Sequence, residues 1–117
     1  MQSEDNVKIS SLKLEKDINN VFSKGSKIGN RFCVLYYQAG TQPNLRLGVF
    51  VPKKVFKKAV DRNRAKRIIR EVFRQEKSDL GGLDIICLLT KCQKGEVSLK
   101  LFSQHISALL QKVPSVL

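Results

Sequence analysis

The side chains best suited to chemistry are concentrated in one basic stretch, residues 53–77. This stretch holds 11 Lys and Arg side chains against three acids, a net charge of +8 within a 117-residue chain whose net charge is +12. Crowded like charges repel one another, and binding to a polyanion relieves that repulsion. The ordinary alternative is a solvated helix face, but such a face normally mixes both signs. The stretch therefore predicts a polyanion-binding surface, with nucleic acid as the leading candidate.

The same stretch has the periodicity of an amphipathic helix, predicted over residues 59–77. Apolar residues from Ala65 to Phe73 recur at i, i+3, i+4, i+7 and i+8, which places them on one face. The residues of roughly the opposite face are Asn63, Lys66, Arg67, Arg70 and Arg74. Arg62 and Arg64 lie near the helix start, where they can project past the end of the core. The pattern predicts a helix that packs one side on a core and presents the other to a partner.

The chain offers few residues for a nuclease active site made of protein alone. Such a site needs clustered carboxylates that hold metal ions, or a general acid–base pair. Asp79 and Asp84 flank a predicted turn, where we interpret them as solubilising or local capping groups. His105 falls at the edge of the last helix's apolar face, where a packed or half-exposed histidine is expected. The three cysteines lack metal spacing, and Cys33 and Cys87 are predicted core thiols. We expect no catalytic residue and no metal site in the protein.

Hydrophobic patterns and turn residues predict the elements that must position the basic stretch. Helices are predicted at residues 11–23, 59–77 and 98–111. Strands are predicted at residues 31–38, 45–51 and 83–90, with a short strand within 26–30. This order, α-β-β-β-α-β-α, predicts one domain over residues 1–117. Its fold class is an α/β (α+β) two-layer sandwich with a mixed sheet of about four strands. Residues 1–10 are polar and predicted to be a disordered tail.

Caps and glycines mark the ends of these elements. We expect Ser10 or Ser11 to cap the first helix and Gly25 to end it. Gly48, in the middle of a predicted strand, indicates a close backbone approach or a bulge. No apolar run approaches the roughly 20 residues of a membrane span, and the N-terminus has no apolar signal region. We therefore expect a cytoplasmic location.

Two aromatic residues could extend the basic surface. Phe22 on the first helix and Tyr36 on a strand could meet the cationic helix across one groove. Aromatic rings stack on unpaired bases while cations follow the backbone. The alternative is that both rings belong to the core, and the sequence pattern leaves that open.

The string from Asp61 to Arg74, DRNRAKRIIREVFR, resembles the RNR signature of the protein subunit of bacterial ribonuclease P. It is preceded by Arg46-Leu47-Gly48 and Val51-x-Lys53-Lys54, which fit the same family. The segment from Leu14 to Gly25 is similar to the family's first helix, and Asn30-Arg31 with Val34-Leu35-Tyr36 is similar to its central strand. The similarity covers roughly residues 12–112.

The resemblance implies a function, a set of partners and one detail of the fold. The protein would join a catalytic RNA in a ribonucleoprotein, an endoribonuclease and hydrolase that removes the leader of precursor tRNA. The RNA would hold the catalytic Mg²⁺ ions, with none bound tightly by the protein. The protein alone would not be catalytic and would be monomeric in the holoenzyme. The family also has a left-handed βαβ crossover, where the general rule predicts a right-handed one.

The charge pattern and the resemblance together give the candidate site residues. Expected contacts to the catalytic RNA are Lys53, Lys54, Lys57, Lys58, Arg62, Asn63, Arg64, Lys66, Arg67 and Arg70. The expected cleft for the single-stranded leader, between the first helix and the sheet, contains Ile18, Phe22, Arg31 and Tyr36. Ile18 stands where the family usually has Phe, so one stacking platform is absent. Glu4 and Asp5 stand where members often carry Lys and Arg, which weakens any RNA role for the tail.

Two other functions compete with this interpretation. One is a general RNA- or DNA-binding protein, for example ribosomal, that uses the same cationic helix. The other is an autonomous nuclease. Cleavage of precursor tRNA only in the presence of the cognate catalytic RNA distinguishes the first interpretation from both.

Overall fold

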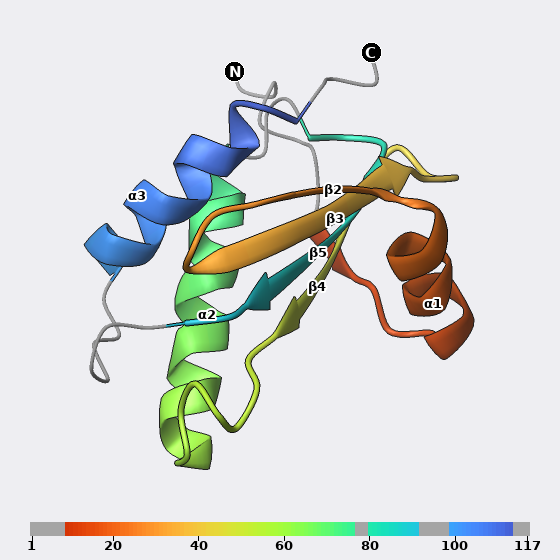
Figure 1. The fold of residues 1–117 in the computed structure, drawn as a ribbon. Helices are drawn as coiled ribbons and strands as arrows, with labels where there is room; N and C mark the ends of the chain where they lie inside the picture. The colour runs from red at the N-terminus through yellow and green to blue at the C-terminus, as the bar shows by residue number, and fades with distance from the viewer. Residues whose placement is uncertain (1–8, 77–79, 92–98, 114–117) are drawn as a thin grey trace.

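The described part of the chain forms a five-stranded mixed sheet with helices on both faces (Figure 1). The structure, a computed structural model, describes residues 9–76, 80–91 and 99–113. The elements in chain order are β1 (Ile9–Ser11), α1 (Glu15–Lys24), β2 (Ser26–Gly29), β3 (Cys33–Ala39), β4 (Leu45–Phe50), α2 (Ala59–Glu76), β5 (Leu83–Leu89) and α3 (Leu99–Leu110). The strand order is β1-β4-β5-β3-β2. β4 pairs in parallel with β1 and β5, and β3 pairs antiparallel with β5 and β2.

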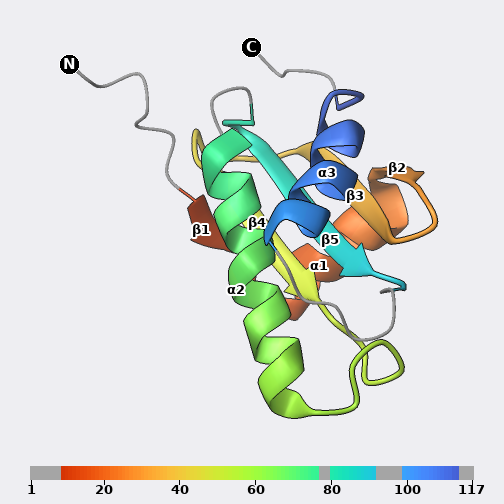
Figure 2. The ribbon, with the colours of Figure 1, turned by 90° about the vertical axis from the view of Figure 1, so that its left-hand side faces the viewer.

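The helices divide between the two faces of the sheet. α2 and α3 cover one face and α1 covers the other (Figures 1 and 2). The predicted α/β class with a mixed sheet is confirmed. Two details differ from the prediction, because the sheet has five strands instead of about four and α1 adds a third layer to the expected two. No helix among the described residues is long and apolar enough to cross a membrane.

The extra strand, β1, corrects the prediction of a disordered tail over residues 1–10 at its last two residues. Ile9 and Ser10 are paired with β4, and the Leu12 N–H donates to the carbonyl of Leu47 at 3.0 Å. The Ile-Ser-Ser sequence carries no apolar run, so its strand conformation depends on a partner far along the chain. Residues 1–8 lie outside the described residues.

The crossover from β4 through α2 to β5 is left-handed. In Figure 2, α2 lies in front of the sheet, both strands run downward, and β5 lies to the right of β4. Turned so that the strands run upward, the same view places β5 to the left of β4. That arrangement is opposite to the usual one for parallel strands joined through a helix. The handedness therefore follows the family resemblance and not the general rule.

α1 begins later than predicted. Ser10 and Ser11 belong to β1, so neither caps the helix, and Leu14 at the N-cap position makes no side-chain hydrogen bond. Glu15 and Asp17 lie in the first turn. Their negative charges interact favourably with the positive N-terminal end of the helix dipole, and this interaction stabilises the start of α1 without a capping side chain.

Glycines at two predicted special positions have different roles. Gly25 ends α1 as expected, and its N–H donates to the carbonyl of Val21 at 2.9 Å. A Cβ at Gly25 would lie 2.5 Å from that oxygen and 2.8 Å from the carbonyl oxygen of Tyr37, so only glycine fits. Gly48 shows no bulge, because β4 pairs in regular register through it. A Cβ there would meet the ring of Phe50 at 3.4 Å, so the space beside Gly48 is filled by that ring.

The predicted apolar face of α2 is buried against the sheet and α3. Ala65, Ile69, Val72 and Phe73 are fully buried, and Ile68 is partly buried against the same core. The thiols of Cys33 and Cys87 are also buried, as predicted. The helix therefore presents its polar side outward because its apolar side is held by the core.

Replacing Ile69 with Ala should lower the free energy of unfolding by about 2–5 kcal/mol, since it leaves a cavity in the core. Urea denaturation followed by circular dichroism measures this change. Val60→Ala is the matched control, because the Val60 side chain on the same helix is 66% exposed. The control should change the stability by less than about 0.5 kcal/mol. Equal losses in both variants would mean that α2 is not anchored through Ile69.

Candidate nucleic-acid interface

The outward side of α2 is cationic and largely without acidic partners. Exposed on it are Asn63, Arg64, Arg67, Arg70 and Arg74, and Lys66 is partly buried. Within the described residues, the salt bridge on this helix joins Arg74 Nε to Glu71 Oε1 at 3.9 Å. Arg64, Arg67 and Arg70 have no salt bridge to any described acid. Their charges are therefore available to an external anion.

The basic loop, Lys53–Lys58, leads into this helix. Its four lysines, Lys53, Lys54, Lys57 and Lys58, are exposed. Arg62 fixes the end of this loop against α2, because its Nη1 donates to the carbonyls of Phe56 at 3.0 Å and Lys57 at 2.8 Å. Arg62 was predicted to contact RNA. The structure shows its guanidinium bound to the protein's own backbone, so it fixes the lysines beside the start of α2.

On the other face of the sheet, α1 brings three of the four predicted cleft residues together. The rings of Phe22 and Tyr36 meet edge to face, with centroids 4.7 Å apart. Ile18 and Tyr36 pack on a small core cluster beneath them. Phe22 is 37% exposed, whereas Tyr36 is partly buried. The Phe22 ring is thus packed against Tyr36 on one side and open to solvent on the other.

Two further residues of this aromatic cluster are not among the predicted site residues. Phe50 from β4 lies 6.0 Å from Phe22, centroid to centroid, and Lys27 Nζ lies 5.6 Å from the Tyr36 ring centroid. Alternation along β4 places Phe50 on the α1 face. The hairpin register pairs Lys27 with Tyr36 across β2 and β3. Alternation along the strand was a signal for Phe50, whereas Lys27 could be found only from the hairpin register.

Arg31, the fourth predicted cleft residue, lies apart from the aromatic cluster. Arg31 lies in the bend before β3, and its neighbour Phe32 stacks on His105 of α3. Tyr36 instead packs with Phe22 on the α1 side of the sheet. The guanidinium carbon of Arg31 lies 5.9 Å from the ring centroid of Phe32, and its carbonyl accepts a hydrogen bond from Thr90 Oγ1 at 3.4 Å. The structure does not bring Arg31 to Phe22.

A partly buried charge network joins α1 to the sheet through Arg46. Arg46 Nε and Nη2 donate to the two carboxylate oxygens of Asp84 at 2.9 and 2.7 Å. Arg46 Nη1 donates to Asp17 Oδ2 on α1 at 3.1 Å. The hydrogen bonds to Asp84 raise the pKa of Arg46 further above its ordinary value, which keeps it charged. Asp84 is 4% exposed. The prediction that Asp84 solubilises or caps a turn is therefore wrong.

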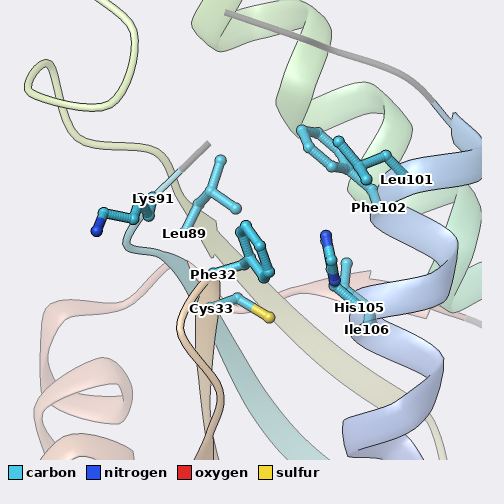
Figure 3. Close-up of a pocket in the computed structure, with 8 residues that line it drawn as sticks. All are labelled: Phe32, Cys33, Leu89, Lys91, Leu101, Phe102, His105 and Ile106. Atoms are coloured by element: carbon cyan, nitrogen blue, oxygen red, sulfur yellow. The ribbon is translucent and has the colours of Figure 1, made fainter. Parts of the chain in front are cut away.

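His105 stacks on Phe32 at the edge of α3, next to a small apolar pocket (Figure 3). The two ring centroids are 3.8 Å apart with an interplanar angle of 18°. The Asn30 side-chain amide donates to the carbonyl of His105 at 3.2 Å. Burial lowers the pKa of His105, so the neutral ring is favoured. The predicted packed or half-exposed histidine is confirmed.

Residues that could hold a metal ion do not cluster in the described parts of the chain. No group of three or more His, Cys, Asp and Glu side chains lies close enough to bind one there. Asp79 and the third cysteine, Cys92, lie outside the described residues.

The fold and these surfaces define a small basic α/β protein of the nucleic-acid-binding kind. A sequence model of the family described as Ribonuclease P matches residues 8–114. The chain therefore belongs to the ribonuclease P protein family, and the resemblance drawn from its sequence motifs is confirmed.

Three comparisons illustrate this membership. The chain is 37% identical over 109 residues to the ribonuclease P protein component of Caldanaerobacter subterraneus subsp. tengcongensis, covering 92% of this chain and 91% of that protein. It is 39% identical over 72 residues to the component of Nitrosococcus oceani, covering 62% of this chain and 60% of that protein. The solved ribonuclease P protein of Staphylococcus aureus is similar with a TM-score of 0.78 and 29% identity, over 90% of this chain and 95% of that one.

Replacing Arg46 with Ala should lower the free energy of unfolding by about 3–5 kcal/mol, because the buried Asp84 carboxylate loses its partner. Thermal and urea denaturation measure this loss. Arg70→Ala, at an exposed arginine without a described salt bridge, should change the stability by less than about 0.5 kcal/mol. The double variant Arg46→Met/Asp84→Leu should recover much of the loss. An Arg46→Ala variant as stable as the control would show that the network does not hold α1.

Proposed function

We propose that this chain is the protein subunit that binds the catalytic RNA of ribonuclease P and promotes removal of the leader from precursor tRNA. Membership in the family makes the chain part of an endoribonuclease holoenzyme with an RNA partner. The observation that carries the proposal is the state of α2. Four residues of its apolar face, Ala65, Ile69, Val72 and Phe73, are fully buried. Arg64, Arg67 and Arg70 are exposed and have no salt bridge to a described acid.

In this proposal the chain binds and positions RNA, and it supplies no reacting group. Metal-assisted hydrolysis would use Mg²⁺ held mainly by the RNA. The guanidinium groups of α2 form charge-assisted hydrogen bonds with phosphates, which are stronger than neutral ones. The lysines of the basic loop add point charges beside the start of the helix, where Arg62 holds them. Together they place a concentrated positive charge where RNA strands approach closely.

The aromatic cluster on the α1 face suits the single-stranded leader. A base could stack on the exposed side of Phe22, whose position is fixed by contacts with Tyr36 and Phe50. Lys27 adds a positive charge above Tyr36, so the backbone of the same strand has a cation within reach. Stacking on rings and pairing of phosphates with cations is the usual way that proteins bind unpaired RNA.

The test of this function is reconstitution of precursor tRNA cleavage at low Mg²⁺ concentration. We expect cleavage when the protein and the cognate catalytic RNA are both present, and none with protein alone. Cleavage by the protein alone would indicate an autonomous nuclease. An unchanged rate when the protein is added to the RNA would indicate a general RNA-binding protein.

Arg64→Ala and Arg67→Ala should each weaken binding to the catalytic RNA by about 1–3 kcal/mol, because each removes charge-assisted phosphate contacts. With roughly six phosphates neutralised, log K for the unsubstituted protein should fall with log salt at a slope near −5. Filter binding over a salt series measures both quantities. Lys112→Ala, at an exposed lysine beyond α3, is the control and should leave them unchanged. An affinity independent of salt would contradict the proposed surface.

Phe22→Ala should weaken binding of leader-bearing precursor tRNA to the holoenzyme by about 1–3 kcal/mol, since a stacked base loses its platform. Mature tRNA, which lacks the leader, should bind almost as before. Leu14→Ala is the matched control, because Leu14 is the 67% exposed apolar residue just before α1. Equal losses for both RNAs would mean that Phe22 acts only as a core residue.

A further inference from the structure

The last residues of β4 and β5 and the first residue of β3 lie side by side at one end of the sheet. The chain just beyond each of them carries basic residues. The register pairs Phe50 with Leu88 and Cys33 with Leu89, so the ends of β4 and β5 and the start of β3 coincide. The basic residues just beyond them are Lys53 and Lys54 after β4, Lys91 after β5, and Arg31 before β3. In both ribbon views, the end of β5 lies on the same side as the loop that enters α2 (Figures 1 and 2). We name these four residues the basic edge.

The guanidinium of Arg31 is held in place by a stack of rings. It lies over one side of Phe32, and Phe32 is stacked on His105. Phe32 is fixed further because its backbone N–H donates to Asn30 Oδ1 at 2.9 Å. A cation over an aromatic face is attracted to the ring while its N–H edges stay free to bind phosphate. Arg31 therefore loses less freedom than an unsupported arginine would on binding.

Lys91 is placed next to Arg31 by the backbone. The N–H groups of Thr90 and Lys91 both donate to the carbonyl of Phe32, at 2.8 and 3.1 Å. Figure 3 shows the Lys91 side chain extending away from the pocket with its ammonium group outward. Both Arg31 and Lys91 are exposed, and neither has a salt bridge to an acid in the described ranges. Two neighbouring cations repel each other, and a bound phosphate would relieve that repulsion.

We propose that Arg31 and Lys91 bind the phosphate backbone of the same RNA that α2 faces. The RNA surface then extends from α2 through the basic loop and along the strand ends to Lys91 and Arg31. This inference rests on the proposed function and deepens it. It also assigns Arg31 to the catalytic RNA and away from the leader cleft, because the Phe32 ring beneath Arg31 stacks on His105 of α3, whereas Phe22 and Tyr36 meet on the α1 side of the sheet.

Binding of the full-length protein to the cognate catalytic RNA, measured over a potassium chloride series, tests the proposal. Arg31→Ala/Lys91→Ala should make the slope of log K against log salt shallower by about 2, since two phosphate contacts are lost. Lys91→Ala alone should change the slope by about 1. The Lys91→Ala variant keeps the backbone hydrogen bonds to Phe32. It therefore tests the proposal even if the Arg31→Ala substitution disturbs the stack of Phe32 on His105. Lys112→Ala should leave the slope unchanged.

A second titration compares precursor tRNA that carries the leader with tRNA that lacks it. The expected result for the double variant is the same ratio of affinities as for the unsubstituted holoenzyme. A loss confined to leader-bearing RNA would overturn the assignment of Arg31 to the catalytic RNA. Unchanged salt slopes, with Arg64→Ala still weakening binding, would overturn only the basic-edge inference. Unchanged binding in the Arg64→Ala variant as well would overturn the proposed function itself.

Discussion

The packing of α2 on the sheet is the constraint on which the rest of the structure depends. Ala65, Ile69 and Val72 lose contact with water, which fixes the rotation of the helix about its axis. At about 100° per residue, this rotation directs Arg64 and Arg67 away from the core. Burial of several apolar side chains stabilises the arrangement by several kcal/mol, whereas the arginines repel one another. The core therefore keeps together charges that electrostatics alone would separate, and an anion bound there removes the repulsion.

The Arg46 network sets the position of α1 in a different way. Buried ion pairs contribute little net stability compared with apolar residues of the same shape. Their bidentate geometry does fix orientation, because both oxygens of Asp84 and one of Asp17 are engaged by one guanidinium. Asp17 and Phe22 belong to the same helix. The network therefore controls where the exposed ring of Phe22 lies relative to the sheet.

Local patterns predicted much of this protein, and long-range pairing accounts for the rest. Neighbouring residues alone were enough to predict the 3.6-residue period of α2, the glycine that ends α1 and the apolar runs of β3 and β5. β1 and the Arg46–Asp84 pair depend on segments more than 30 residues apart, so no window of sequence contains their cause. The location of Arg31 depends on where three strands end. The left-handed crossover came from the resemblance, because sheet twist predicts the opposite hand.

The central place of β5 in the sheet has a consequence for synthesis of the protein. β3 and β4 do not pair with each other, because β4 is hydrogen-bonded to one side of β5 and β3 to the other. Of the native strand pairs, a nascent chain that has not reached residue 83 can form only β2–β3 and β1–β4. These are two half-sheets with open edges, the kind of surface that invites wrong pairing. Translation of the last third of the chain therefore joins the two halves from the middle, and ribosome-bound fragments that end earlier have no route to the native sheet.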